Sequence, residues 1–169
     1  MNTLNDTLKN KLHDVRLLLL DIDGVMTDGT MWFSPEGTCY KPFHAHDGMG
    51  ITELNKHTDI MVGVISGHPS KTVQYRLEQL HVQHIHLGCD DKLPVYNTLL
   101  ETLKITDQHV AYIGDDINDL PILARAGVKI AVNNAMPIVK EQVDYVTQRS
   151  GGQGAVREIC DFLIELHRS

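Results

Sequence analysis

The sequence predicts an α/β fold with a doubly wound, Rossmann-like and mostly parallel sheet that has helices on both faces. Short runs of aliphatic and β-branched residues alternate with segments of helical periodicity. Aspartates and small polar residues directly follow several of these runs, where ligands bind in open parallel sheets. The 169 residues are enough for one hydrophobic core. We therefore expect a single domain over residues 1–169.

The expected strands are apolar runs of strand length. They cover residues 15–20, 60–65, 84–87, 109–113, 129–132 and 144–147. Amphipathic segments predict helices over residues 50–57, 70–80, 93–103, 120–126 and 137–141. A last helix is indicated by apolar residues at helical spacing from Ala155 to Ile164. This alternation predicts βαβ units and a parallel sheet.

One segment interrupts the alternation. Residues 30–34 and 38–43 flank the turn sequence Pro35-Glu36-Gly37. Two short runs around such a turn predict a β-hairpin flap, placed directly after the first strand. It is too short to be a cap domain, so we expect no cap domain.

Composition limits the partners. A net charge of -7 argues against a nucleic-acid partner but not against a phosphorylated substrate, because a bound cation can offset it. No stretch approaches the roughly 18 apolar residues of a membrane span, and the first residues lack a signal peptide's apolar region. Cys39, Cys89 and Cys160 are scattered, as in reduced cytoplasmic proteins. We expect a cytoplasmic protein with no membrane partner.

Two acidic clusters carry the chemistry. Asp21-Ile22-Asp23-Gly24 follows the first strand, and Gly114-Asp115-Asp116-Ile117-Asn118-Asp119 follows the fourth. In the first, one carboxylate can act as nucleophile and metal ligand and the other as general acid and base. Taken alone, each cluster could be a turn or a helix cap. Together they favour Mg²⁺, which prefers oxygen ligands.

Two further residues suit a phosphate. Ser66 ends the second strand and precedes Gly67, so a hydroxyl and backbone N–H groups can meet a phosphate oxygen. Lys92 lies between the third strand and the next helix, where its charge can offset nucleophile and phosphate. Singly, they would suggest only a turn and a surface lysine.

In their order along the chain, these residues resemble the phosphatase motifs of the haloacid dehalogenase superfamily. The runs Thr27-Asp28-Gly29, His46-Asp47-Gly48-Met49-Gly50 and Gly151-Gly152-Gln153-Gly154-Ala155-Val156-Arg157-Glu158 look like its small capless branch. The resemblance covers roughly residues 15–166. It implies phosphate monoester hydrolysis through an aspartyl-phosphate with Mg²⁺.

The resemblance also implies residue roles. Asp21 would be nucleophile and metal ligand, and Asp23 acid/base and a metal ligand through its carbonyl. Asp115 would complete the metal ligands, with Asp116 and Asp119 in support around the metal. Ser66 and Lys92 would be catalytic phosphate binders. The expected substrate contacts are Asp23, His44, Ala45, His46, Asp47, Gly48, His68, Arg76 and Lys92.

The branch acts on phosphates of 2-keto-3-deoxy sugar acids of lipopolysaccharide synthesis and forms homotetramers in which a neighbour helps to close the site. The 8-phosphate of an eight-carbon octulosonate is therefore the expected substrate. The alternatives are the phosphate of a nine-carbon relative and a broad set of small phosphate esters. His46 and His68 stand where relatives usually have arginine, which binds a carboxylate better. A phosphorylation-receiver module is the non-enzyme alternative, although receivers need no acid such as Asp23.

Overall fold

The structure, a computed structural model, describes residues 4–167. Its centre is a sheet of six strands in the order β5-β4-β1-β6-β7-β8, and every neighbouring pair is parallel. The strands are β1 (Leu17–Leu20), β4 (Met61–Ser66), β5 (His84–Leu87), β6 (Val110–Gly114), β7 (Val128–Ala131) and β8 (Tyr145–Val146). The expected strands are confirmed, with ends that differ from expectation by at most two residues.

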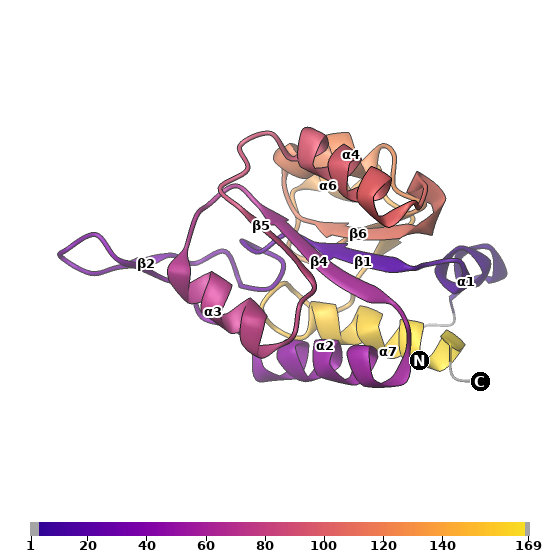
Figure 1. The fold of residues 1–169 in the computed structure, drawn as a ribbon, viewed down its shortest axis with the longest axis horizontal. Coiled ribbons are helices and arrows are strands. Elements are labelled where there is room, and N and C mark those ends of the chain that lie inside the picture. Colours follow the sequence, from indigo (N-terminus) through magenta and orange to yellow (C-terminus); the bar gives the residue numbers. More distant parts are fainter. Residues whose placement is uncertain (1–3, 168–169) are drawn as a thin grey trace.

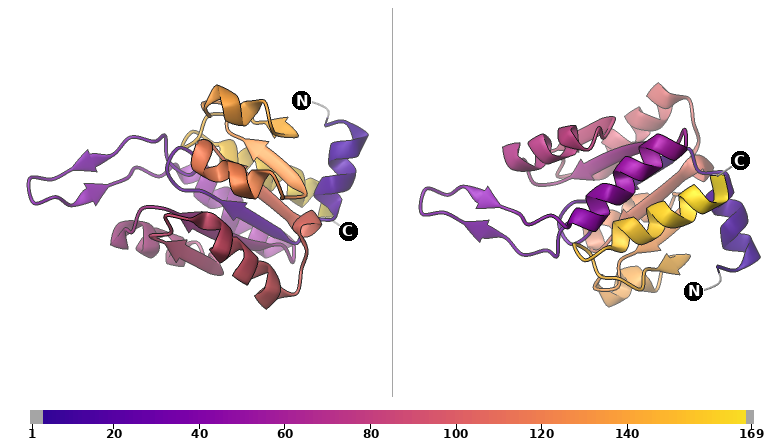
Figure 2. Two further views of the ribbon diagram at one scale, coloured as in Figure 1. Left: turned by 90° about the horizontal axis from the view of Figure 1, so that it is seen from above. Right: turned by 90° about the horizontal axis from the view of Figure 1, so that it is seen from below.

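Helices cover both faces of the sheet. On one face lie α2 (Ala45–His57), α3 (Lys71–Gln79) and α7 (Ala155–His167). On the other lie α4 (Lys92–Leu103) and α6 (Pro137–Lys140), with α5 (Leu120–Leu123) packed beside α4. Figure 2 shows α2 and α7 side by side under the sheet. The doubly wound class is confirmed.

The sheet is buried because both faces are covered. All four leucines of β1 are buried, as expected of a central parallel strand. The stripe expected on the last helix is also buried, and α7 presents it to the core. Among residues 4–167, no helix is long and apolar enough to span a membrane.

Strand order places a switch point at β1. The chain adds β4 and β5 on one side of β1, then returns to add β6, β7 and β8 on the other. The residues that follow β1, β4 and β6 therefore meet at one edge of the sheet, where doubly wound folds bind ligands.

The hairpin is present. Its strands are β2 (Trp32–Phe33) and β3 (Cys39–Tyr40), which pair antiparallel. Figures 1 and 2 show it projecting away from the body, at the end opposite the chain termini. The side chains of Trp32, Phe33 and Tyr40 are exposed.

Three helical segments differ from expectation. The helix α5 ends at Leu123 rather than at residue 126. The helix α1 (Asp6–His13) was not expected, although Asn5 caps it and accepts a hydrogen bond from the Leu8 N–H at 2.8 Å. The helix α2 begins at Ala45 rather than at residue 50. Gly48 and Gly50 weaken the helical signal there, because glycine is a poor helix former.

Candidate active site

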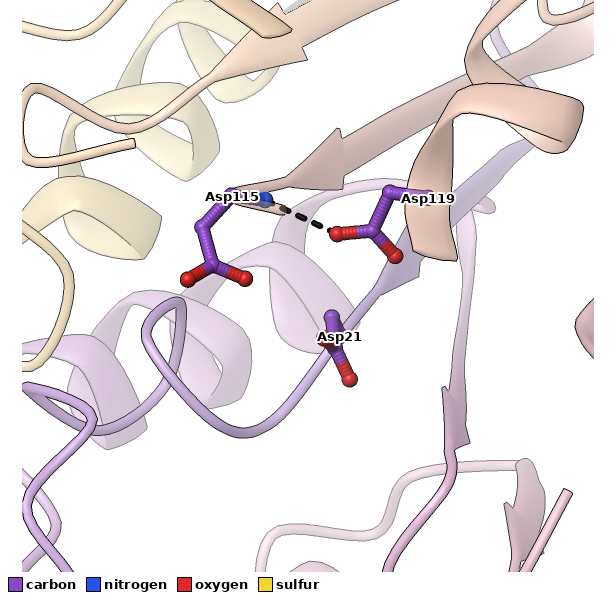
Figure 3. A group of neighbouring side chains, drawn as sticks. All are labelled: Asp21, Asp115 and Asp119. Carbon is purple, nitrogen blue, oxygen red and sulfur yellow. Dashed lines mark hydrogen bonds between the residues drawn. The ribbon is translucent and has the colours of Figure 1, made fainter. Parts of the chain in front are cut away.

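Neighbouring strands bring the two acidic clusters together. Leu20 of β1 lies opposite Ile113 of β6, and each strand is followed closely by an aspartate. Carboxylate oxygens of Asp21, Asp115 and Asp119 all lie within 4.8 Å of one another. Figure 3 shows these side chains gathered at the ends of the two strands.

Gly24 allows this close approach. Its φ of +85° lies in the left-handed region, which favours glycine. A Cβ at this position would collide with the Asp115 carboxylate. The Asp-Gly turn after β1 is therefore shaped to let the second aspartate reach the first.

Asp21 is a buried carboxyl group with an unusual proton affinity. Burial, with the nearby charge of Asp119, raises its pKa to about 7. Lys92 opposes this shift, with its ammonium 3.0 Å from an Asp21 oxygen, and the Ile22 N–H donates to Asp21 at 2.7 Å. These two donors orient the carboxylate while leaving it able to accept further partners.

The ionised form of Asp115 is disfavoured even more than that of Asp21. Burial, followed by the charges of Asp21 and Asp119, raises its pKa to about 8. No hydrogen-bond donor contacts its carboxylate within residues 4–167. Free, crowded carboxylate oxygens suit a hard divalent cation, so Asp21 and Asp115 fit Mg²⁺.

Asp119, by contrast, is fully engaged by protein donors. One of its oxygens accepts from the Lys92 ammonium at 2.7 Å and the Tyr112 hydroxyl at 2.6 Å. The other accepts from the backbone N–H groups of Asp115 and Asp116 at 2.8 and 3.3 Å. Asp119 therefore holds the loop and the lysine in place rather than offering an oxygen to a metal.

Lys92 is a buried cation held by two aspartates. Burial alone would lower its pKa, but Asp21 and Asp119 outweigh this effect and raise it. The lysine therefore keeps its positive charge beside Asp21.

An open cavity of about 470 Å³ lies at this edge of the sheet. It is lined by Asp21, Asp23, Gly24, Gly29, Ser66, Gly67, His68, Asp115, Asp116, Ile117 and Asn118. Ser66, at the end of β4, and His68, just beyond it, line the same cavity as the aspartates. Larger cavities elsewhere contain neither acidic cluster.

Of the expected substrate contacts, only Asp23 and His68 line the cavity. Lys92 is buried against Asp21 and is absent from the lining. His44 caps α2 by accepting from the His46 N–H, and Ala45 begins that helix. Asp47 is buried and accepts from the Gly154 and Arg157 N–H groups at the start of α7. The cavity at the aspartates is lined by none of these residues.

Three more of these residues also lie outside the cavity. Arg76, on α3, lies against Gly48, where a Cβ would meet its guanidinium group. The side chain of His46 lines a separate groove along α7. The role of this set as substrate contacts stays a prediction.

One contact at the site could not be found from sequence. The ammonium of Lys41 lies 2.6 Å from Asp23 Oδ2, and the lysine side chain is buried. Lys41 follows β3, so the contact joins the hairpin to the site. No motif or periodicity relates positions 23 and 41, and an isolated lysine in a hairpin is ordinary.

Comparisons with known proteins identify the family of the chain. A family model for haloacid dehalogenase-like hydrolases matches residues 51–159. The chain belongs to this family. A curated relative from Escherichia coli strain K12, 3-deoxy-D-manno-octulosonate 8-phosphate phosphatase, is 41% identical over 154 residues, which are 91% of this chain and 81% of the relative.

Solved structures of the family have the same fold. The phosphatase of that name from Yersinia pestis superposes with a TM-score of 0.93 and 40% identity, over 96% of this chain and 87% of the other. The Moraxella catarrhalis phosphatase superposes with a TM-score of 0.91 and 36% identity, over 95% and 91%. That structure is a complex with a magnesium ion, a phosphate ion and a KDO molecule. The expected family and the absence of a cap domain are confirmed.

Proposed function

We propose that this chain is a Mg²⁺-dependent phosphatase that hydrolyses 3-deoxy-D-manno-octulosonate 8-phosphate through an aspartyl-phosphate on Asp21. The convergence of Asp21, Asp115 and Lys92 at the switch point carries the proposal. The relatives at 40% identity or more over most of the chain support the substrate. A sugar phosphate of this kind is an intermediate of lipopolysaccharide synthesis, as the sequence resemblance implies.

The first half of the reaction forms the covalent intermediate. A carboxylate oxygen of Asp21 attacks phosphorus, and the bond from phosphorus to the sugar oxygen breaks. Asp23 donates a proton to the departing oxygen. Lys92 and Ser66 bind the phosphoryl oxygens beside Asp21. The protein groups that would hold Mg²⁺ are the carboxylates of Asp21 and Asp115 and the backbone carbonyl of Asp23, with Asp116 and Asp119 in support.

The second half restores the enzyme. Asp23, now ionised, takes a proton from water, and the resulting hydroxide attacks phosphorus. The bond from phosphorus to Asp21 breaks, which releases inorganic phosphate and regenerates the carboxylate. A bound Mg²⁺ would supply positive charge that lowers the repulsion between the Asp21 carboxylate and the phosphate.

Recognition of the sugar acid is proposed at the open side of the cavity. His68 lines it, and its Nδ1 is buried without a partner among the described residues. A buried ring nitrogen needs a partner, which a substrate hydroxyl or carboxylate can provide. We also propose that the accessible members of this set, His44, Ala45, His46 and Arg76, contribute across subunits of a homotetramer. Asp47 and Gly48 are buried, and they support the position of this segment instead.

The assembly and its setting are part of the proposal. The exposed Trp32, Phe33 and Tyr40 make the hairpin a suitable surface for another copy of the chain. One continuous core supports a single domain. The free cysteines Cys39, Cys89 and Cys160 favour the cytoplasm.

The test is steady-state phosphate release from a panel of esters. It includes octulosonate 8-phosphate, a nine-carbon 2-keto-3-deoxy sugar acid phosphate and a sugar phosphate without a carboxylate, each with Mg²⁺ and with excess chelator. We expect the highest kcat/KM for octulosonate 8-phosphate and no turnover in chelator. A higher value for the nine-carbon ester, or equal values for all three, would replace the substrate with one of the two alternatives.

A further inference from the structure

Lys41 is a buried cation that the proposed mechanism does not yet use. Its side chain is 0% exposed, and its ammonium lies 2.6 Å from Asp23 Oδ2. Burying an ammonium group is costly unless a charged or hydrogen-bonding partner compensates. Here the partner is a residue of the site rather than a neighbour in the hairpin.

The two oxygens of Asp23 are in different surroundings. Oδ2 accepts from Lys41. Oδ1 is buried and has no partner among the residues that the structure describes. Asp23 also lines the cavity beside Asp21. One oxygen is therefore anchored, and the other has no hydrogen-bond partner within the described part of the chain.

The anchor comes from the hairpin. Lys41 immediately follows β3, which pairs only with β2 in its two-stranded sheet. The ion pair thus joins the base of the projecting hairpin to the turn after β1, across eighteen positions of sequence. A displacement of the hairpin base would move the group that orients Asp23.

We propose that Lys41 is a positioning residue, which fixes the Asp23 carboxyl group so that Oδ1 faces the leaving oxygen and thereby makes acid catalysis depend on the hairpin. The proposal rests on the acid/base role proposed for Asp23. Lys41 itself does not touch the reacting atoms; it acts through Asp23.

The experiment compares Lys41→Met, which removes the charge at similar length, with Lys41→Arg, which keeps it. The first-turnover rate of ester cleavage is measured with enzyme in excess over octulosonate 8-phosphate or 4-nitrophenyl phosphate. The alkoxide of the first ester needs a proton to leave, whereas 4-nitrophenolate leaves readily without one. Circular dichroism, thermal unfolding and light scattering check the fold and the assembly of each variant.

We expect Lys41→Met to slow cleavage of octulosonate 8-phosphate by at least about tenfold, part of the 10²–10⁴-fold that a general acid supplies. KM should change little, and 4-nitrophenyl phosphate should lose much less rate. Lys41→Arg should recover a large part of the loss. In an Asp23→Asn background, Lys41→Met should cause no further loss, because the residue it positions no longer carries the proton.

Other outcomes overturn the proposal. If Lys41→Met slowed the cleavage of both esters equally, Lys41 would only support the fold. The same conclusion would follow if Lys41→Met slowed cleavage as much in the Asp23→Asn background as in the unmutated protein. An active Lys41→Met beside an impaired Asp23→Asn would remove the role of Lys41 and leave the proposed function intact. Full activity of Asp23→Asn would instead remove the proposed acid, and the role of Lys41 with it.

Discussion

At the scale of single residues, the site is organised around carboxyl groups that are unfavourable as neighbouring anions. Asp21 and Asp115 have pKa values raised to about 7 and about 8, chiefly by burial and then by nearby aspartates. Lys92 relieves only part of this, since it also serves Asp119. A divalent cation would relieve the rest, which is why the site favours one.

Magnesium affinity should therefore depend on pH. The folded pKa values of Asp21 and Asp115 exceed the ordinary 3.8, so the metal-free folded protein keeps protons that the unfolded chain releases. The free energy of unfolding of the metal-free protein should fall as the pH rises from about 4 to about 8. Mg²⁺ competes with the same protons, so we expect its affinity to rise at least about tenfold between pH 6 and pH 8.

Isothermal titration calorimetry at several pH values measures this affinity. Asp115→Asn is the matched control, because it removes one of the two titrating groups with little change in volume. Its affinity for Mg²⁺ should be weaker and its pH dependence shallower. An affinity that is constant from pH 6 to pH 8 in the unmutated protein would contradict the account.

Specificity should change at His68. We expect His68→Arg to lower the KM for octulosonate 8-phosphate, because a permanent bidentate donor suits the substrate carboxylate better than an imidazole. Steady-state kinetics with this ester and with a phosphate ester that lacks the carboxylate measure the difference. Equal responses of the two esters would mean that His68 does not recognise the carboxylate.

The sequence could place some of the site residues but not all. Asp21 and Asp115 follow strands and Ser66 ends one. Parallel strands bring their carboxyl ends to one edge of the sheet, so the meeting of these residues could be expected. Lys41 could not be predicted, because its contact with Asp23 depends on the path of the hairpin. That path is set by tertiary packing, which leaves no local pattern.

At the scale of elements, the packing of α2 against α7 explains why residues 45–49, several of them expected substrate contacts, form the start of a helix. A Cβ on Gly50 would lie 3.0 Å from the Arg157 Cα, so glycine lets the two helices approach closely. Asp47 accepts from N–H groups at the start of α7. These tertiary contacts outweigh the low helix propensity of the two glycines in α2, Gly48 and Gly50.

Asp47→Ala should therefore destabilise the protein. It leaves two N–H groups at the start of α7 without their acceptor, at a cost of about 1–2 kcal/mol. The midpoint temperature of thermal unfolding should fall by roughly 2–8 °C. Asp161→Ala is the matched control on the same helix: its ion pair with Arg157 is largely exposed, so we expect less than about 0.5 kcal/mol. Equal losses in the two variants would contradict the capping role.

At the scale of the whole molecule, strand and helix order followed from the sequence because burial on both faces leaves long apolar runs, as in β1. The helix α1 was missed, since Leu8 and Leu12 provide only a short apolar stripe. The proposed homotetramer would depend on exposed surface, above all on the hairpin, whose Trp32 and Phe33 are 66% and 64% exposed.

If the proposed tetramer forms through the hairpin, the double variant Trp32→Ser, Phe33→Ser should lower the mass of the assembly in solution. Burial of such aromatic side chains is the main favourable contribution that the hairpin offers to association. Size-exclusion chromatography with light scattering measures the mass. Tyr75→Ser is the control, because Tyr75 is equally exposed but lies on α3. A tetramer that survives the double variant unchanged would place the interface elsewhere.

The central claim is that the phosphoryl group is transferred to the Asp21 carboxylate before it is transferred to water. The most direct measurement is a rapid quench during turnover of octulosonate 8-phosphate, followed by borohydride reduction and mass spectrometry of the peptides. An aspartyl-phosphate is reduced to homoserine, and we expect this change at Asp21 alone, only when both substrate and Mg²⁺ are present. Continued turnover with Asp21 unmodified, or with the change at another aspartate, would contradict the mechanism.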